Sequence, residues 1–246
     1  MDLAKHTLGL PKISILMPTY NRSKFIPFIL RNLKIQNYPH KLLQLVIHDD
    51  GEIPLFDNYQ EFSDTIKPIK LKYIRNKTKL SIGEKRHQLV QNANNNIVCF
   101  MDDDDMYEPT YISHSYETLK QNKAGCVGCD KMIFIYPPYT INDFYALDCG
   151  DNKKLIHEAT LMFHKSWYQK TKGFLNSSKA EGLGITQSCK LKTIALTNPY
   201  YTMTAVVHGK NTIDKDQFKN DRSKLDPSTL LVDPNLTDFI SAVCSI

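Results

Sequence analysis

The sequence predicts an α/β protein with a central, mostly parallel mixed sheet flanked by helices. In the first two-fifths of the chain, short apolar runs typical of buried strands alternate with segments of helical periodicity. This alternation indicates βαβ units and therefore a doubly wound sheet. The second half is also rich in strand-like runs, but they follow one another with only short helical pieces between them. We expect that half to be mixed and partly antiparallel, and to add its strands to the same sheet.

Each element has its own pattern. The expected strands of the first half cover residues 12–18, 43–49, 69–75 and 96–101. The expected helices cover residues 22–37, 54–66 and 82–94. Ser23 is the expected cap of the first helix, and Pro27 is tolerated because it falls in the first turn. Further strands are expected within 125–136, 143–148, 157–165 and 200–209, with a short helical piece in 180–192.

Composition narrows the class of protein. With 246 residues, 41% of them hydrophobic and 10% aromatic, the chain resembles an ordinary globular protein. No apolar run approaches the roughly 18 residues of a membrane span, and the N-terminus lacks the order of a secretion signal, so we expect no transmembrane segment and a cytoplasmic location. The net charge of +5 is mild and the basic residues form no block, so no nucleic-acid partner is expected. The six cysteines are scattered, which fits reduced thiols. The oligomeric state stays open.

Four consecutive aspartates, Asp102 to Asp105, follow the last apolar run of the first half. Ligands of parallel α/β sheets bind at the carboxyl ends of the strands, and two other expected strands end at 17–22 and 48–51. We expect these ends to converge on one crevice. So many carboxylates, with no matching cations nearby in the sequence, favour a bound Mg²⁺ or Mn²⁺ ion, which prefers carboxylate and phosphate oxygens. The pattern predicts a nucleoside diphosphate site, and a solvated acidic loop is the alternative.

Three motifs in order resemble the nucleotide-sugar motifs of family 2 glycosyltransferases: ISILMPTYNR, LVIHDDG and LSIGEKRHQLVQNANNNIVCFMDDDDMYEP. The resemblance covers about residues 12–212 and implies the GT-A (Rossmann-like) fold. It implies one domain over 1–213, with a nucleotide-binding half at about 12–109 and an acceptor-binding half at about 110–213. Residues 214–246 are polar and are expected to form a peripheral C-terminal tail with one short helix.

The resemblance also implies the reaction. Members of the family transfer a sugar, with inversion, from a nucleoside diphosphate sugar to an acceptor hydroxyl. For this chain we expect a UDP-sugar as donor, Mn²⁺ or Mg²⁺ as cofactor, and a glycan, protein or lipid-linked acceptor.

The resemblance assigns roles near the nucleotide. Asp50 matches the aspartate that accepts a hydrogen bond from the base, and Arg86 matches a basic residue near the base and phosphates. His87 departs from the pattern, because the family often has asparagine there. The residues expected around the nucleoside are Pro18, Tyr20 and Arg22.

The family's Asp-X-Asp pattern maps to Asp102 and Asp104. Asp104 would ligate the metal directly, with Asp102 as a further ligand, and Asp102 or Asp103 would reach the ribose or a metal-bound water. His208 resembles a late histidine of the family that reaches the metal or the diphosphate, although a structural histidine is the simpler interpretation. Asp105 has the least certain role of the four.

An inverting transfer needs a base for the acceptor hydroxyl. Glu181, in AEGLGI, resembles the family's acidic position and is the expected catalytic base. The alternatives are a helix-start role for Glu181, stabilised by the helix dipole, and Asp143 or Asp148 as the base.

Two other functions compete with this one. A non-catalytic carbohydrate- or nucleotide-binding module with a degenerate site would lack a motif aspartate, and none is missing. A sugar nucleotidyltransferase would carry a glycine-rich phosphate loop after the first strand, whereas PTYNRSKF contains no glycine.

Overall fold

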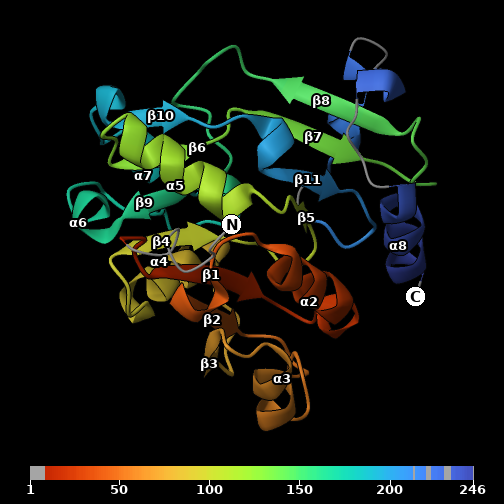
Figure 1. The fold of residues 1–246 in the computed structure, drawn as a ribbon, viewed down its shortest axis with the longest axis horizontal. Coiled ribbons are helices and arrows are strands. Elements are labelled where there is room, and N and C mark those ends of the chain that lie inside the picture. Colours follow the sequence, from red (N-terminus) through yellow and green to blue (C-terminus); the bar gives the residue numbers. More distant parts are fainter. Residues whose placement is uncertain (1–8, 213, 220–222, 230–233, 246) are drawn as a thin grey trace.

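The structure, a computed structural model, describes residues 9–212, 214–219, 223–229 and 234–245. The strands of the described residues form two sheets, one of seven strands and one of four (Figure 1). In spatial order, the larger sheet contains β10 (Ile194–Leu196), β6 (Cys126–Gly128), β9 (Met162–His164), β4 (Ile97–Phe100), β1 (Ile13–Thr19), β2 (Leu43–Asp49) and β3 (Lys70–Arg75). The smaller sheet contains β5 (Met106–Tyr107), β11 (Met203–Val206), β7 (Lys131–Ile135) and β8 (Phe144–Asp148).

The larger sheet is mixed and mostly parallel, as predicted. β4, β1, β2 and β3 run parallel, and β9 is inserted antiparallel between β4 and β6. The expectation that all strands of the second half join this sheet is wrong, because β7, β8 and β11 form a second sheet with β5, in which β11 pairs with β5 and β7, and β7 pairs with β8. An apolar strand satisfies its backbone groups equally well in either sheet, so its sequence pattern does not name the partner.

The helices connect and cover these strands. They are α2 (Ile26–Ile35), α3 (Tyr59–Thr65), α4 (Ile82–Asn92), α5 (Tyr111–Gln121), α6 (Lys165–Tyr168), α7 (Leu183–Thr186) and α8 (Pro234–Cys244). Short 3-10 turns occur at η1 (Ser23–Phe25), η2 (His40–Leu42), η3 (Glu158–Thr160), η4 (Leu191–Thr193), η5 (Pro199–Tyr201), η6 (Asp216–Phe218) and η8 (Pro227–Thr229).

Local caps explain where the helices of the first half begin. Ser23 does not cap α2; it begins η1, and Phe25 is the N-cap of α2. The helix expected at 54–66 begins at Tyr59, because Asn58 accepts hydrogen bonds from the first backbone N–H groups. α4 begins with a capping box, in which Ser81 accepts a hydrogen bond from the Glu84 N–H and Glu84 accepts one from the Ser81 N–H.

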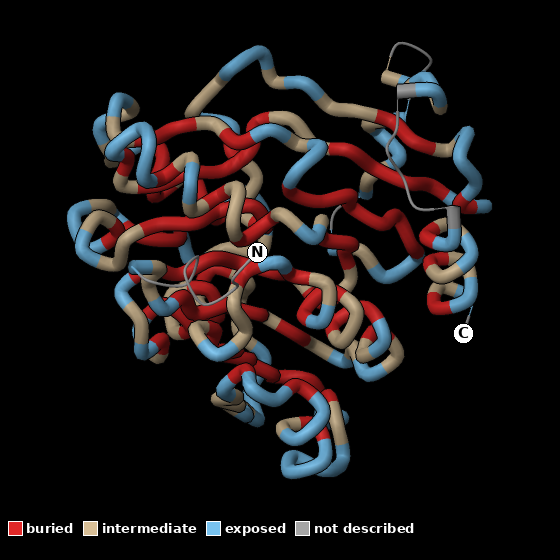
Figure 2. The backbone as a smooth tube through the Cα atoms, in the orientation of Figure 1, coloured by how far each residue is buried: buried red, intermediate tan, exposed pale blue. Residues whose placement is uncertain are grey.

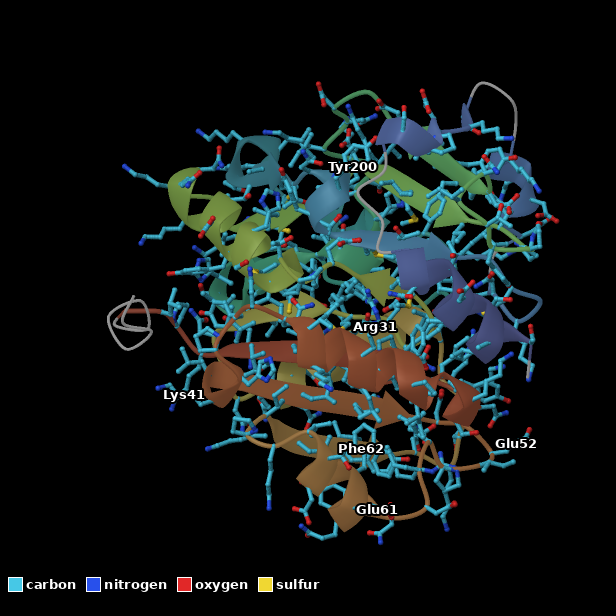
Figure 3. All side chains as sticks on the ribbon, turned by 45° about the vertical axis from the view of Figure 1, so that its right-hand side comes forward. Arg31, Lys41, Glu52, Glu61, Phe62 and Tyr200 are labelled. Atoms are coloured by element: carbon cyan, nitrogen blue, oxygen red, sulfur yellow. The ribbon has the colours of Figure 1, made fainter. Side chains whose placement is uncertain are left out.

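The two faces of the larger sheet are both buried, as Figure 2 shows for its central strands. Side chains alternate along β1, so Ile13 and Ile15 pack in the cluster that includes α2 and α5, whereas Leu16 packs in the cluster that includes Leu89 of α4. At the β3 edge, Phe62 of α3 stacks on Phe56 with ring centroids 4.5 Å apart, while the neighbouring Glu61 points outward (Figure 3).

The C-terminal segment packs on the domain at one edge (Figure 1). α8 buries Leu236, Ile240 and Val243 in a cluster with Phe25 and Phe28. None of the helices in the described part of the chain is both long and apolar enough to cross a bilayer.

Candidate active site

The ends of β1 and β4 and the first turns of α4 enclose a cavity of about 570 Å³. Two of the three predicted strand ends, 17–22 and 102–105, contribute residues to this cavity, whereas residues 48–51 do not line it, although β2 lies next to β1 in the sheet. The predicted residues that line this donor cavity, as we name it, are Pro18, Tyr20, Arg22, Arg86, Asp102, Asp103 and Asp104. Lys79, Lys85 and Lys210 also line it and give it several cations.

Arg86 connects two of the predicted acidic residues. Its two terminal nitrogens donate to the two carboxylate oxygens of Asp102 at 3.0 and 2.9 Å, and its Nε donates to Glu181 at 3.0 Å. The guanidinium is 4% exposed. Burial opposes its charge, but Asp102 and Glu181 outweigh burial and raise the pKa of Arg86. The arginine thus fixes the two carboxylates relative to each other.

Asp50 is buried and bonds to residues of the donor cavity without lining it. Its carboxylate accepts hydrogen bonds from Lys85 Nζ at 2.8 Å and from the Leu80 N–H at 2.7 Å. Lys85 and Leu80 both line the cavity, whereas Asp50 is not among its lining residues. Asp49 caps the following turn by accepting hydrogen bonds from the N–H groups of Gly51 and Leu55, both at 2.8 Å.

His87 faces away from this site. Its Nδ1 lies 2.9 Å from the hydroxyl oxygen of Tyr168, and its Nε2 lies 2.8 Å from the side-chain amide nitrogen of Gln91. The departure from the family pattern at this position therefore does not alter the wall of the donor cavity.

Asp103 and Asp104 are neighbours with opposite electrostatics. Burial, reinforced by the adjacent Asp104, raises the pKa of Asp103, which accepts a hydrogen bond from the Thr19 hydroxyl. Burial also disfavours the charge of Asp104, but His208 and Arg22 outweigh it and hold the pKa of Asp104 below its ordinary value. One oxygen of Asp104 lies 3.0 Å from His208 Nε2 and 3.1 Å from an Arg22 nitrogen.

Asp105 points away from the donor cavity toward the second sheet. It accepts a hydrogen bond from the Val206 N–H at 2.9 Å and lies 3.7 Å from Lys215 Nζ. Burial raises its pKa to about 7.

The carboxylates have cationic partners, although none stands beside them in the sequence. Each of Asp50, Asp102 and Asp104 is paired with a cation, namely Lys85, Arg86 and Arg22 respectively. Arg86 lies in the same motif as Asp102, whereas Arg22 and Lys85 lie in other motifs than the aspartates with which they pair. The cations that folding brings beside these aspartates offset the negative charge of the cluster, so a metal ion is not the sole source of compensation.

Asp104 and His208 are candidate ligands for a divalent ion. The carboxylate and the imidazole converge to 3.0 Å, and both are ligand types that Mn²⁺ accepts. Asp102 uses both oxygens on Arg86, and no group of three or more His, Cys, Asp or Glu side chains in the described part of the chain is arranged to hold a metal. Two protein ligands leave room for the diphosphate oxygens and water that complete such sites.

Arg22 offers a donor for an anion in the same place. Its Nη1 is buried without a hydrogen-bond partner in the described structure, although its Nη2 binds Asp104 and the Lys210 carbonyl. A buried donor of this kind is costly unless a ligand satisfies it. The sequence pointed to Arg22 as part of the nucleoside loop, but not to its place beside Asp104.

A second cavity of about 210 Å³ shares Arg86, Asp102 and Asp104 with the first. We name it the acceptor cavity. Glu181 and Glu158 both line it, and the Gly182 N–H donates to Glu158 at 2.9 Å. Burial, followed by the neighbouring Glu181, raises the pKa of Glu158.

Neither alternative base lies at the site. Asp143 accepts hydrogen bonds from Thr140 in an exposed turn, and Asp148 pairs with Lys131 at 3.2 Å in another exposed region. Neither lines the donor or the acceptor cavity. Glu181 immediately precedes the N-cap of α7, so the predicted helix-start position is observed, and its side chain points into the shared site.

Sequence reasoning missed several residues of the site. Lys85 stands next to Arg86 in the same motif, and its position on α4 could have indicated that it belongs to the site. His157, Glu158, Lys215 and Phe218 line the acceptor cavity, and none of them follows a recognised motif. Lys215 and Phe218 belong to the segment that was expected to be a peripheral tail.

The protein has the GT-A fold of glycosyltransferases, with two adjoining cavities at the edge of its larger sheet. The chain belongs to glycosyl transferase family 2, whose family model matches residues 14–171. A dolichyl N-acetyl-alpha-D-glucosaminyl phosphate 3-beta-D-2,3-diacetamido-2,3-dideoxy-beta-D-glucuronosyltransferase of Methanococcus voltae is 23% identical over 199 residues, covering 77% of this chain.

Two solved structures have a similar fold. The mannosyltransferase PcManGT from Pyrobaculum calidifontis, in complex with GDP-Man and Mn²⁺, has a TM-score of 0.61 at 16% identity and covers 82% of this chain and 58% of its own. S. aureus TarS 1–349 in complex with UDP-GlcNAc has a TM-score of 0.62 at 16% identity and covers 94% of this chain and 70% of its own. The chain spans 58% of the length of the Methanococcus voltae relative. It spans 19% of the length of another curated relative, an uncharacterized glycosyltransferase of Rickettsia conorii.

Proposed function

We propose that this protein transfers a sugar from a nucleoside diphosphate sugar to an acceptor hydroxyl, with inversion and with the help of a divalent metal ion. The observation that carries the proposal is the junction of the two cavities. Arg86, Asp102 and Asp104 line both cavities, His208 lies 3.0 Å from Asp104, and Glu181 lines the acceptor cavity.

The donor cavity suits a nucleoside diphosphate. Tyr20 offers an aromatic ring for the base, and Lys79 Nζ lies 3.9 Å from the centroid of that ring. Arg22 and Lys210 supply cations for the diphosphate. The parallel with the UDP-GlcNAc complex of TarS makes a UDP-sugar the first donor to test, while the GDP-Man complex of PcManGT makes a GDP-sugar the second.

Asp104 and His208 are the proposed metal ligands. When bound there, Mn²⁺ or Mg²⁺ would stabilise the negative charge that develops on the departing nucleoside diphosphate. Arg22 would add a fixed positive charge on the same side, because its buried Nη1 lacks a partner in the described structure.

Glu181 is the proposed base. A carboxylate oxygen of Glu181 would take the proton of the acceptor hydroxyl. The hydroxyl oxygen would attack the anomeric carbon from the acceptor cavity as the bond from that carbon to the diphosphate oxygen breaks. Inversion requires that the hydroxyl attack from the side of the sugar opposite the diphosphate, and the proposal places the acceptor in the cavity that adjoins the donor cavity at Arg86. Arg86 orients Glu181 through its Nε.

The first experiment is differential scanning fluorimetry with nucleoside diphosphates and nucleotide sugars, with Mn²⁺ and with EDTA. Wild type should show a metal-dependent rise in Tm with one base, and Asp104→Ala should lose it while staying folded. NMR of the released or transferred sugar then gives the anomeric configuration and tests inversion. A folded wild type that responds to no nucleotide would favour the degenerate binding module instead.

A further inference from the structure

The acceptor cavity combines an apolar wall with a polar one. Met132 and Phe134 of β7 and Phe218 of η6 supply the apolar side chains. His157, Glu158 and Glu181, from η3 and the segment before α7, supply polar atoms. Its volume of about 210 Å³ lies below the roughly 300 Å³ at which pockets for drug-sized ligands begin. The cavity is therefore sized for a single small ring.

The aromatic part of this wall is held in place. The rings of Phe134 and Phe218 stack with centroids 5.4 Å apart and an interplanar angle of 22°. The Tyr136 hydroxyl donates to the Lys215 carbonyl at 2.6 Å, and Lys219 Nζ lies 5.1 Å from the centroid of the Tyr136 ring. These contacts fix η6 against the second sheet, so Phe218 is presented to the cavity before any ligand binds.

One polar group of the cavity has no partner. The Nε2 atom of His157 is buried and makes no hydrogen bond in the described structure. Burial, followed by the charge of Lys215, lowers the pKa of His157 to about 4, so the ring is neutral and can accept or donate one hydrogen bond there. A ligand hydroxyl would satisfy this atom.

The composition of the wall disfavours an anionic ligand. Five carboxylates line the cavity, Asp102, Asp104, Asp105, Glu158 and Glu181, against the two cations Arg86 and Lys215. A phosphate or carboxylate group would face net repulsion in this setting. A fatty chain would bury the polar groups without satisfying them.

We propose that the acceptor cavity binds a neutral sugar ring that carries the acceptor hydroxyl, with an apolar face of the ring on Phe218 and its hydroxyls on His157 and Glu158. A pyranose has apolar C–H groups on its faces and hydroxyls around its edge, which matches the composition of the cavity. The inference rests on the proposed transferase function and specifies the acceptor as a glycan rather than a peptide or a lipid headgroup.

The test is saturation-transfer difference NMR with UDP, Mn²⁺ and a panel of methyl glycosides of glucose, galactose, mannose and N-acetylglucosamine. Wild type should transfer saturation to UDP and to at least one glycoside. Phe218→Ala should keep the UDP signal and raise the Kd of that glycoside about tenfold, the loss expected for one aromatic contact. Phe218→Tyr should bind the glycoside as wild type does.

The matched control is Phe239→Ala, because Phe239 belongs to the same C-terminal segment, stacks on Phe28 and does not line either cavity. It should leave glycoside binding unchanged. A UDP signal without any glycoside signal, or glycoside binding that Phe218→Ala leaves intact, would overturn the acceptor inference alone. A wild type that gives no signal with UDP or, in the same experiment, with GDP would instead refute the proposed function on which it rests.

Discussion

Arg86 and Asp102 lie 16 residues apart in the sequence and form a bidentate ion pair at the junction of the two cavities. The pair fixes the first aspartate of the acidic run and, through the third donor of the same guanidinium, fixes Glu181 as well. A planar fork with donors on three nitrogens is needed for this, so lysine is not an equivalent residue.

Arg86→Lys should therefore lower the transfer rate strongly while changing the free energy of unfolding less. The lysine keeps a positive charge but cannot hold both carboxylates, and misplacement by about an ångström costs about 100-fold in rate. Arg86→Ala should in addition lower the free energy of unfolding by about 3 to 5 kcal/mol, since it leaves buried carboxylates unpaired. Urea unfolding and transfer assays on the two variants measure the two effects separately.

A second substitution supplies the control for this prediction. Adding Glu181→Gln to Arg86→Ala removes one of the unpaired charges, so stability should recover in part while activity stays low. Full recovery of activity in that double variant would show that neither Arg86 nor Glu181 is needed for transfer.

The elements of the first half could be predicted because their signals are local. The expected strand at 43–49 is observed with the same bounds, and the expected helix at 82–94 is observed as α4, which has a capping box at its start. Alternating apolar residues and caps act over a few neighbouring positions, so one sequence suffices to read them.

The ion pairs of the site could not be predicted in the same way. Asp104 meets His208 across 104 residues, and Arg86 meets Glu181 across 95. Such contacts depend on which strands are neighbours, and the pattern of β7 and β11 does not reveal that they form a second sheet. For the same reason, nothing in the polar sequence around Phe218 indicated that it lines a cavity.

His208→Asn and Asp104→Asn should each weaken the apparent affinity for Mn²⁺ by at least about tenfold, because each removes one of the two proposed protein ligands. The measurement is a Mn²⁺ titration of the Tm rise in the presence of UDP. His164→Asn is the matched control, because His164 lies at the edge of another surface cavity with Trp167. Equal Mn²⁺ dependence in His208→Asn and wild type would remove His208 from the metal site.

Gly83→Ala should displace a residue of the active site, although Gly83 itself does not line either cavity. A Cβ at Gly83 would lie 1.8 Å from the Leu175 carbonyl oxygen, so the segment that leads to Glu181 must move. Overpacking of this kind costs about 1 to 3 kcal/mol, and the displaced Glu181 should lower the transfer rate. Gly209→Ala is the control, since a Cβ there meets nothing within 4 Å. Differential scanning fluorimetry measures the loss of stability in both variants, and a transfer assay measures the loss of rate. A fully active Gly83→Ala would show that the segment tolerates the shift.

His157 should make the stability of the protein depend on pH. Burial, followed by the charge of Lys215, lowers its pKa from 6.5 to about 4, so between these values the unfolded chain binds the proton more readily than the folded one. The free energy of unfolding that His157 contributes is therefore fully present above pH 6.5 and is lost as the pH falls toward 4. His157→Gln cannot take up this proton, and carboxylates such as Glu158 titrate in both proteins. Urea unfolding at pH 7, 5.5 and 4.5 should show a steeper loss in wild type than in His157→Gln, and parallel losses would mean that His157 is accessible to protons in the folded state.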